Sequence, residues 1–314
     1  MPWPDCPSIL SSEHNIVSLD VANPPLVYTR VCRLWRVVAH STPRVWSHIQ
    51  IVLRVKIKPW KPFFPYFLQC WLARSGRLPL TLYIVDGFQH RIHGWVQPGA
   101  NSRVLDVLLS ESQRLETVLM SPVYSWDPDF DTPQLRTLVC NNRSLRRINA
   151  PKLSRLHFYG YFYLNVPDGQ PTLTCRNLRL EAASTHAICS AIASFPHLET
   201  ILVDEAVGFY YRDVPTPISS SVLKSMILPL AYVLKDTQQG HIHLFTRLHL
   251  PMLQKLTLVG APEKVQVDCL LAMLAVASFQ VPVVDFQTST PLSTVHMNNI
   301  APLLSIVREV THDG

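Results

Sequence analysis

Residues 23–49 read NPPLVYTRVCRLWRVVAHSTPRVWSHI. Asn23 is a favourable helix cap, and Pro24 lies where a missing backbone N–H costs little. Thr42 and Pro43 repeat this start, so the stretch predicts a first helix and then a short second helix that carries Trp46. The apolar residues of the first helix recur at three- and four-residue steps and form one stripe: Val27, Val31, Leu34, Trp35 and Val38.

The run VCRLWRVVAHSTPRVW within this stretch resembles the second half of an F-box, and it is most similar to the fungal-type F-box proteins. The segments SSEHN…NPPLVYTR before it and WLARSGRLPLTL after it are also similar to segments of those proteins, so the resemblance spans roughly residues 11–85. An F-box of this kind opens with Leu-Pro and an amphipathic helix. Here only Pro7, Ile9 and Leu10 precede the polar SSEHN, so we expect that first helix to be absent or reduced to one turn.

The resemblance implies docking on the Skp-type adaptor of a cullin ubiquitin ligase. It implies three parts of the chain: a partial F-box-like helical module over residues 1–50, a junction over 51–85 and a leucine-rich-repeat-like domain over 86–314. The residues that it assigns to the packed module and its adaptor-docking surface are Leu26, Val31, Cys32, Trp35, Pro43 and Trp46.

The positive charge of the chain is concentrated in this module. The net charge is +6, yet residues 21–85 contain ten Arg or Lys and no Asp or Glu. Such a segment favours an acidic partner. Aromatic residues interleaved with Lys58 and Lys61 loosely resemble a stacking platform for single-stranded nucleic acid. Prolines 59, 62 and 65 favour a rigid junction instead, and no nucleic-acid motif accompanies the charge.

A weak repeat follows the junction. Its core is L-x-x-L-x-L, often with a proline two residues before it, and it predicts short strands. The clearest copies are QRLETVLM, PQLRTLVC, PKLSRLHF, PHLETILV and PMLQKLTL, with weaker copies in CRNLRL and PLSTVHM. Strands are also predicted at residues 51–57 and 80–84.

Helical patterns lie between these strands. They are predicted at residues 66–75, 104–112, 185–195, 219–235, 263–279 and 300–310. Each strand is too short to bury its apolar face alone, so stacking satisfies both patterns. The sequence therefore predicts an α/β chain in which the helical module precedes an irregular leucine-rich-repeat-like solenoid. A plain α/β domain with coincidental leucines is the alternative.

In a stacked repeat the residues between the leucines project from the inner face of the sheet. This pattern places a substrate-binding surface on residues of four of the repeat copies. The side chains that carry this prediction are Arg136, Arg155, His157, Glu199, Gln254 and Lys255.

Catalytic and metal-binding patterns are incomplete. His90-x-x-His93 and His241-x-His243 have spacings compatible with metal ligation, but neither has a cysteine or carboxylate set that completes a site. Asp127, Asp129 and Asp131 alternate as in part of a calcium loop, without its glycine and terminal glutamate. The sequence has no phosphate-cradling glycine loop and no nucleophile elbow. We therefore expect no enzymatic activity, no cofactor and no metal.

The cysteines and the N-terminus bear on location. Seven cysteines are scattered and odd in number, and the opening MPWPDCPSIL lacks the pattern of a signal peptide. The longest apolar run, residues 269–279, is about half a membrane span. We expect reduced thiols, no membrane segment, and a cytoplasmic or nuclear protein.

Two functions follow as hypotheses. The first is a non-enzymatic adaptor of a Skp–cullin–F-box ubiquitin ligase, which tethers an unknown protein substrate through the repeat domain. The alternative is a leucine-rich interaction protein whose vestigial F-box no longer binds the ligase.

Overall fold

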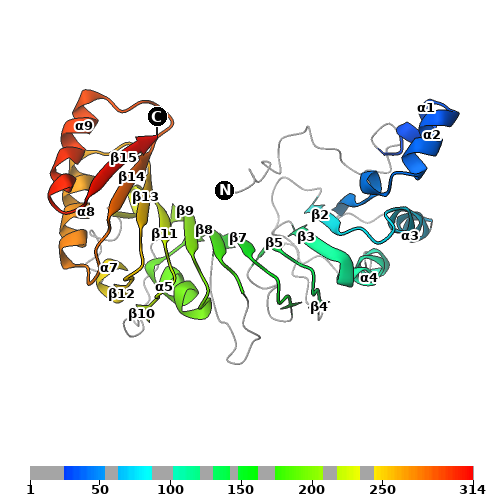
Figure 1. Cartoon of the computed structure of the whole chain (residues 1–314), viewed down its shortest axis with the longest axis horizontal. Helices are drawn as coiled ribbons and strands as arrows, with labels where there is room; N and C mark the ends of the chain where they lie inside the picture. Colours follow the sequence, from blue (N-terminus) through cyan, green and yellow to red (C-terminus); the bar gives the residue numbers. More distant parts are fainter. Residues whose placement is uncertain are drawn as a thin grey trace. The chain divides into compact units, whose positions relative to one another are not determined.

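The computed structural model of the chain describes residues 25–53, 63–86, 102–120, 130–141, 148–161, 174–207, 218–233 and 244–313. It divides into two compact units, Met1–Lys152 and Leu153–Gly314. Both units are mixtures of helices and parallel strands (Figure 1), which confirms the predicted α/β class. The division falls within the predicted repeat domain, and the boundaries predicted at residues 50 and 85 stay predictions.

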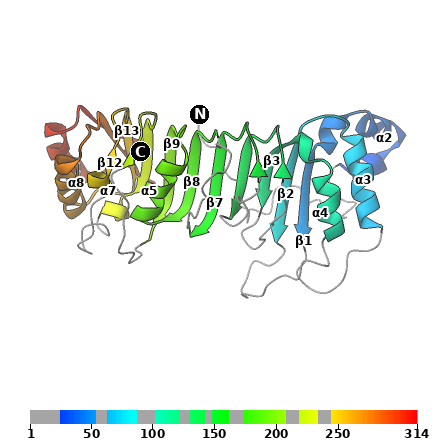
Figure 2. The same cartoon turned by 90° about the horizontal axis from the view of Figure 1, so that it is seen from below.

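The first unit contains four parallel main strands in the order β1-β2-β3-β5, with β1, β2 and β3 side by side in Figure 2. These strands are β1 (His48–Leu53), β2 (Leu80–Asp86), β3 (Leu115–Met120) and β5 (Thr137–Asn141), and the short β4 (Phe130–Asp131) pairs with β6 (Ile148–Asn149). Its helices are α1 (Tyr28–Val31), α2 (Arg33–His40), η1 (Pro43–Trp46), α3 (Phe64–Arg74), α4 (Ser102–Leu109) and η3 (Ser112–Arg114).

Two tryptophans form the core beside α2. Trp46 and Trp71 are both buried, with ring centroids 5.1 Å apart and planes at 82°. Each indole N–H is satisfied: Trp46 Nε1 donates to the carbonyl of Ala39 at 2.7 Å, and Trp71 Nε1 donates to the carbonyl of Trp46 at 3.0 Å. The guanidinium carbon of Arg74 lies 4.7 Å from the Trp46 ring centroid. The pair therefore joins η1 to α3 by ring packing and by hydrogen bonds.

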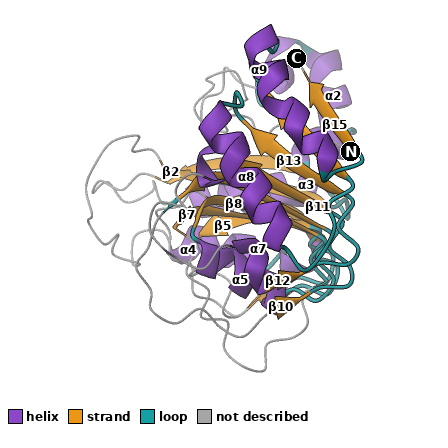
Figure 3. Cartoon of the chain, turned by 90° about the vertical axis from the view of Figure 1, so that its left-hand side faces the viewer, coloured by secondary structure: helices purple, strands orange, loops and turns teal. Residues whose placement is uncertain are grey.

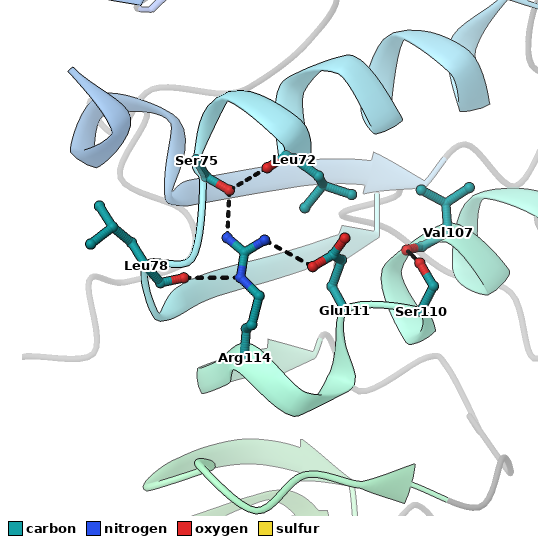
Figure 4. Close-up of polar contacts among 7 residues, drawn as sticks. All are labelled: Leu72, Ser75, Leu78, Val107, Ser110, Glu111 and Arg114. Carbon is teal, nitrogen blue, oxygen red and sulfur yellow. Dashed lines mark hydrogen bonds and ion pairs between the residues drawn. The ribbon is translucent and has the colours of Figure 1, made fainter. Parts of the chain in front are cut away.

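A buried serine and an arginine join three further elements of this unit (Figure 4). Ser75 is buried after the end of α3, and its hydroxyl donates to the carbonyl of Leu72 at 2.6 Å. Arg114 donates to the Ser75 hydroxyl at 2.6 Å, to the carbonyl of Leu78 at 3.1 Å and to Glu111 Oε2 at 2.8 Å. Three acceptors of one guanidinium fix the turn before β2 against η3.

The second unit contains seven main strands in the order β7-β8-β9-β11-β13-β14-β15, and every pairing between them is parallel. They are β7 (Arg155–Tyr161), β8 (Asn177–Ala183), β9 (Thr200–Ala206), β11 (Ser225–Pro229), β13 (Lys255–Val259), β14 (Val283–Gln287) and β15 (Glu309–Asp313); β10 (Ile218–Ser219) pairs with β12 (Leu248–His249).

The helices of the second unit cover one face of its sheet. They are α5 (Thr185–Ser194), α7 (Leu244–Arg247), α8 (Lys264–Val276), α9 (Thr294–Ile300) and η5 (Ala301–Ser305). Each of α5, α7, α8 and α9 contacts the next, and all four lie on the same side of the strands (Figures 1 and 3). No described helix lies over the other face, which we call the helix-free face.

Five strands of the second unit, β8, β9, β11, β13 and β15, are entered through the same hydrogen-bonded turn. The backbone N–H groups of Arg176 and Asn177 both donate to the carbonyl of Ser154, at 3.1 and 3.0 Å. The same pattern of two consecutive N–H groups on one carbonyl recurs at residues 199–200 on Arg176, 224–225 on Glu199, 254–255 on Lys224 and 308–309 on Pro282. In each case one carbonyl accepts from two consecutive N–H groups at the start of the following strand. This shared geometry aligns the starts of neighbouring strands.

The register aligns the buried side chains into ladders on the helix-covered face. One ladder of paired, fully buried residues consists of Leu156, Leu178, Ile201, Met226, Leu256 and Val284. The residue three positions earlier is also buried in each repeat, as Leu153, Cys175, Leu198, Leu223, Leu253 and Val281. Burial raises the pKa of the Cys175 thiol to about 12, so this cysteine acts as a small apolar residue.

Three strands that the leucine spacing does not predict extend this alignment. They are centred on Met226, Val284 and Val310, where methionine or valine replaces leucine. The helices predicted at residues 219–235 and 300–310 are wrong in part, because residues 225–229 form β11 and residues 309–313 form β15, whereas residues 301–305 form the 3-10 helix η5. These strands lie in the long spacings between the recognised copies, which is why the leucine pattern is irregular.

The last predicted copy, PLSTVHM, is also wrong as a strand. Its residues begin α9, which is capped by Ser293: the hydroxyl of Ser293 accepts from the backbone N–H of His296 at 3.4 Å. Val295 and Met297 of this copy are exposed. A serine cap before a short apolar run favours a helix start over a strand.

The other predicted helices are confirmed with shifted ends. Residues 185–194 form α5, in which the Ser184 hydroxyl accepts from the N–H of Ala187 at 3.2 Å. Residues 264–276 form α8, where Glu263 and Gln266 make a capping box. Residues 102–109 and 64–74 form α4 and α3. Caps and apolar spacing were sufficient to locate these four helices.

One glycine carries a testable prediction. Gly160 interrupts β7 at a register shift with φ of 73°, and its N–H is bonded to the Glu181 carboxylate of β8. A Cβ added there meets no atom within 4 Å, so Gly160→Ala tests backbone strain alone. We expect it to lower the free energy of unfolding by about 1–2 kcal/mol, measured by urea denaturation. An unchanged stability would show that this bulge can relax.

Candidate protein-binding surfaces

The helix predicted over the opening stretch is broken. Cys32 is extended, with φ of −158° and ψ of 176°, so α1 ends at Val31 and α2 begins at Arg33. Arg36 compensates for the break, because its Nε donates to the carbonyl of Thr29 at 2.7 Å. The prediction of one continuous helix is therefore wrong, and a side-chain hydrogen bond holds the two short helices together.

The apolar stripe of this helix pair faces solvent. Leu34 is 69% exposed and Trp35 is 51% exposed, and the Tyr28 ring lies 5.7 Å from the Trp35 ring. We call the exposed apolar side chains of this pair the α2 surface: Val31, Leu34, Trp35, Val37 and Val38. Large exposed apolar groups that cluster on one element mark interaction sites more often than isolated ones do.

The six residues assigned to adaptor docking fall into three groups by exposure. Trp46 is fully buried and holds the module together. Leu26 is half-buried, and the other four are exposed: Val31, Cys32, Trp35 and Pro43. The exposed group is accessible to a partner, whereas Trp46 stabilises the module that presents it.

Basic side chains surround the α2 surface. Arg30, Arg33, Arg36 and Arg44 are all exposed, and residues 25–53 and 63–85 contain no carboxylate side chain. Phe64 and Trp71 of the aromatic junction are buried, so they are not available as stacking platforms for bases. An acidic protein surface with apolar pockets is the complementary partner.

A second candidate surface is the helix-free face of the second unit. Successive strand side chains alternate, so the residues between the buried ladders lie on this face. In one row His157, Arg179, Leu202 and Ile227 are consecutive register partners on β7, β8, β9 and β11. The row continues through Thr257, Asp285 and Thr311. It therefore passes from polar to apolar and back to polar across the sheet.

Ion pairs link neighbouring strands on this face. Arg179 forms a bidentate pair with Asp204, at 2.8 and 3.0 Å. Near the strand starts, Glu199 lies between two cations, 3.2 Å from Arg176 and 3.0 Å from Lys224. These pairs orient side chains that are partly exposed, and each contributes little to stability by itself.

His157 is buried rather than solvated. It is 4% exposed, its ring lies 4.6 Å from the ring of Tyr159, and its Nε2 has no hydrogen-bond partner among the described residues. Burial and then the nearby Arg179 charge lower the pKa of His157 to about 3. The imidazole is therefore neutral at physiological pH.

Asp285 is a buried carboxylate on the same face. Lys255 Nζ lies 2.9 Å from its Oδ2, and the Thr311 hydroxyl donates to its Oδ1 at 2.5 Å. Burial acts to raise the pKa of Asp285, but Thr311, Lys255 and Thr257 outweigh it, and the pKa is lowered overall. The carboxylate is therefore ionised and paired.

The structure divides the predicted substrate-surface residues between the two units. Arg136 belongs to the first unit, where it lies 3.4 Å from Glu116. The second unit contains Arg155, His157, Glu199, Gln254 and Lys255. The prediction missed further residues of the helix-free face: Arg179, Leu202, Asp204, Ile227 and Asp285. The two-residue alternation of the recognised copies indicates the first three, whereas Ile227 and Asp285 lie in missed repeats.

The described residues show neither a metal-ligand cluster nor a membrane-spanning helix. Within the described ranges, no group of three or more His, Cys, Asp or Glu side chains is placed to hold a metal ion. His90, His93, His241, His243, Asp127 and Asp129 lie outside the described residues, as do Pro7, Ile9 and Leu10. None of the described helices has the length and hydropathy needed to cross a membrane.

Comparison with known proteins adds no family assignment. No protein-family model matches the chain, and no curated protein matches its sequence.

Proposed function

We propose that the chain is a non-enzymatic substrate-recognition adaptor of a Skp–cullin–F-box type ubiquitin ligase. The α2 surface docks on the Skp-type adaptor, and the repeats hold a protein substrate. The F-box-like module and the solenoid of the repeats are parts of this proposal, as is a cytoplasmic or nuclear location. Tethering alone raises the local concentration of substrate at the ligase, so no catalytic group is needed.

The exposed α2 surface is the observation that carries the proposal. A helix pair held by Trp46 and Trp71 presents Leu34 and Trp35 outward instead of burying them. Aromatic side chains at the centre of an interface dominate its binding energy. The repeated turns and ladders of the second unit support the substrate-holding part, because a stacked repeat offers an extended surface.

The proposal predicts that Trp35→Ala weakens adaptor binding. A central tryptophan contributes about 2 kcal/mol or more at a protein interface, which is a loss of about 30-fold or more in affinity. The measurement is biolayer interferometry of the full chain on an immobilised Skp-type adaptor.

Val265→Ala is the matched control, because Val265 is an exposed apolar residue on α8 of the second unit. It is expected to bind like the unchanged chain. If the unchanged chain does not bind the adaptor, the ligase proposal fails, and a leucine-rich interaction protein with a vestigial F-box becomes the better description.

A further inference from the structure

The centre of the helix-free face is apolar. Leu202 of β9 and Ile227 of β11 are register partners, and Pro229 and Val259 are partners two residues further along β11 and β13. Val259 is 46% exposed, and the other three are half-buried. A protein-binding surface typically has such an apolar centre within a polar rim.

The rim carries opposite charges at its two ends. Near the carboxyl ends of β8 and β9, Glu181 and Asp204 are exposed on this face, and one cation, Arg179, is paired with Asp204. Near the amino ends, Arg176 and Lys224 are exposed and share the single carboxylate of Glu199. The charge of the rim therefore runs from negative to positive along this part of the sheet.

His157 is a second and independent indication of a ligand. Its Nε2 is buried and has no hydrogen-bond partner in the described part of the chain, and His157 lies in the same row as Leu202. An unsatisfied buried polar atom costs about 1–3 kcal/mol, which a bound polar group would recover. Two strand spacings place the Leu202 position roughly 10 Å away, within reach of one bound segment.

We propose that this face binds a polypeptide segment of defined charge order. An aliphatic or aromatic side chain of the segment rests on Leu202 and Ile227. A Lys or Arg on one side of it lies near Asp204 and Glu181, and an Asp or Glu on the other side lies near Arg176 and Lys224. A neutral polar group of the segment bonds to His157 Nε2. This inference rests on the proposed substrate-holding role of the repeats and names the class of segment held.

The spacing supports the charge order. Leu202 and Asp204 are two residues apart on one strand, or roughly 6.6 Å. An extended segment therefore reaches the acidic end one or two residues after its apolar anchor. Because Arg179 is neutralised by Asp204, a purely acidic segment gains less at this end than a basic one.

Selection of phage-displayed random 12-residue peptides on the immobilised full chain tests the inference. We expect the selected peptides to share an apolar residue that is flanked within four positions by Lys or Arg on one side and Asp or Glu on the other. A synthetic consensus peptide should then bind the chain in solution by fluorescence anisotropy. Selected peptides without this order, or no selected peptides, would overturn the inference.

Variants of the face make the test specific. Leu202→Thr and Ile227→Thr keep strand-favouring residues and should each weaken the consensus peptide about tenfold. Asp204→Asn should reduce the preference for Lys or Arg, and His157→Leu should weaken binding without changing the charge preference. Val265→Thr on α8 is the control. Circular dichroism establishes that each variant is folded, and equal binding by all variants would also overturn the inference.

Failure here is distinguishable from failure of the proposed function. The Trp35→Ala chain should lose the adaptor and keep the peptide, and the Ile227→Thr chain should do the reverse. Adaptor binding without the peptide pattern overturns only the inference. Peptide binding without adaptor binding overturns only the ligase role.

Discussion

Trp46→Ala is expected to lower the free energy of unfolding by about 3–5 kcal/mol, whereas Trp35→Ala should change it by less than about 0.5 kcal/mol. The two residues lie in the same opening stretch and are the same amino acid. They differ in burial, since Trp46 is fully buried and Trp35 is half exposed. Removing Trp46 leaves a cavity and also removes its hydrogen bond to Ala39.

Urea denaturation followed by far-UV circular dichroism measures this difference without relying on tryptophan fluorescence. The first unit should unfold at lower urea in Trp46→Ala only. If Trp46→Ala and Trp35→Ala lower the free energy of unfolding equally, Trp35 is packed in solution. The α2 surface would then not be available to a partner. The pair of variants therefore tests the geometry beneath the proposed docking site.

Lys255→Met is expected to lower the free energy of unfolding by about 2–3 kcal/mol at pH 7. The lysine is 44% exposed, but its partner Asp285 is only 1% exposed. Without the ammonium, the buried carboxylate keeps its hydrogen bond from Thr311 but loses its ion pair with Lys255. The aliphatic stem of methionine replaces much of the lysine volume, so the lost charge dominates the effect.

The loss of stability in Lys255→Met depends on pH, and the direction of this dependence follows from the pKa of Asp285. In the unchanged chain the pKa of Asp285 is lowered from its ordinary 3.8, so its contribution is complete above that value and is lost as pH falls through the folded pKa. Removing Lys255 raises the pKa. The deficit of Lys255→Met should therefore be largest near neutral pH and should shrink below about pH 4, where the carboxyl is protonated.

Lys224→Met is the matched control. Lys224 is 48% exposed and also bonds a carboxylate, but its partner Glu199 is 31% exposed. Lys224→Met should lower the free energy of unfolding by less than about 1 kcal/mol, and this decrease should depend little on pH in this range. Equal effects of the two lysine variants would show that water reaches Asp285.

Leucine spacing located the strands that begin L-x-x-L, such as those with Leu156 and Leu256, because a leucine at each buried position is a direct signal of burial. It missed the strands with Met226 and Val284, where other aliphatic residues fill the same position in the ladder. A short apolar run has no period that separates a buried strand from a helix. Only the register of neighbouring strands resolves it.

The candidate surfaces were predicted less completely. The residues of the opening stretch were found, but the break at Cys32 depends on the Arg36 bond to Thr29, which no local propensity indicates. His157 was found as a position on the inner face, but its burial arises from neighbours such as Tyr159 and Arg179. Alternation predicts which face a side chain takes, whereas solvent access depends on side chains from other strands.

The strand order also bears on how copies of this chain avoid one another. β15 is last in that order, so one side of its backbone takes no part in the sheet pairing. An open strand edge is a template for association between molecules. β15 is short and begins with Glu309. Two such edges meeting in parallel would bring like charges together, which disfavours fibre-like growth from this end of the sheet.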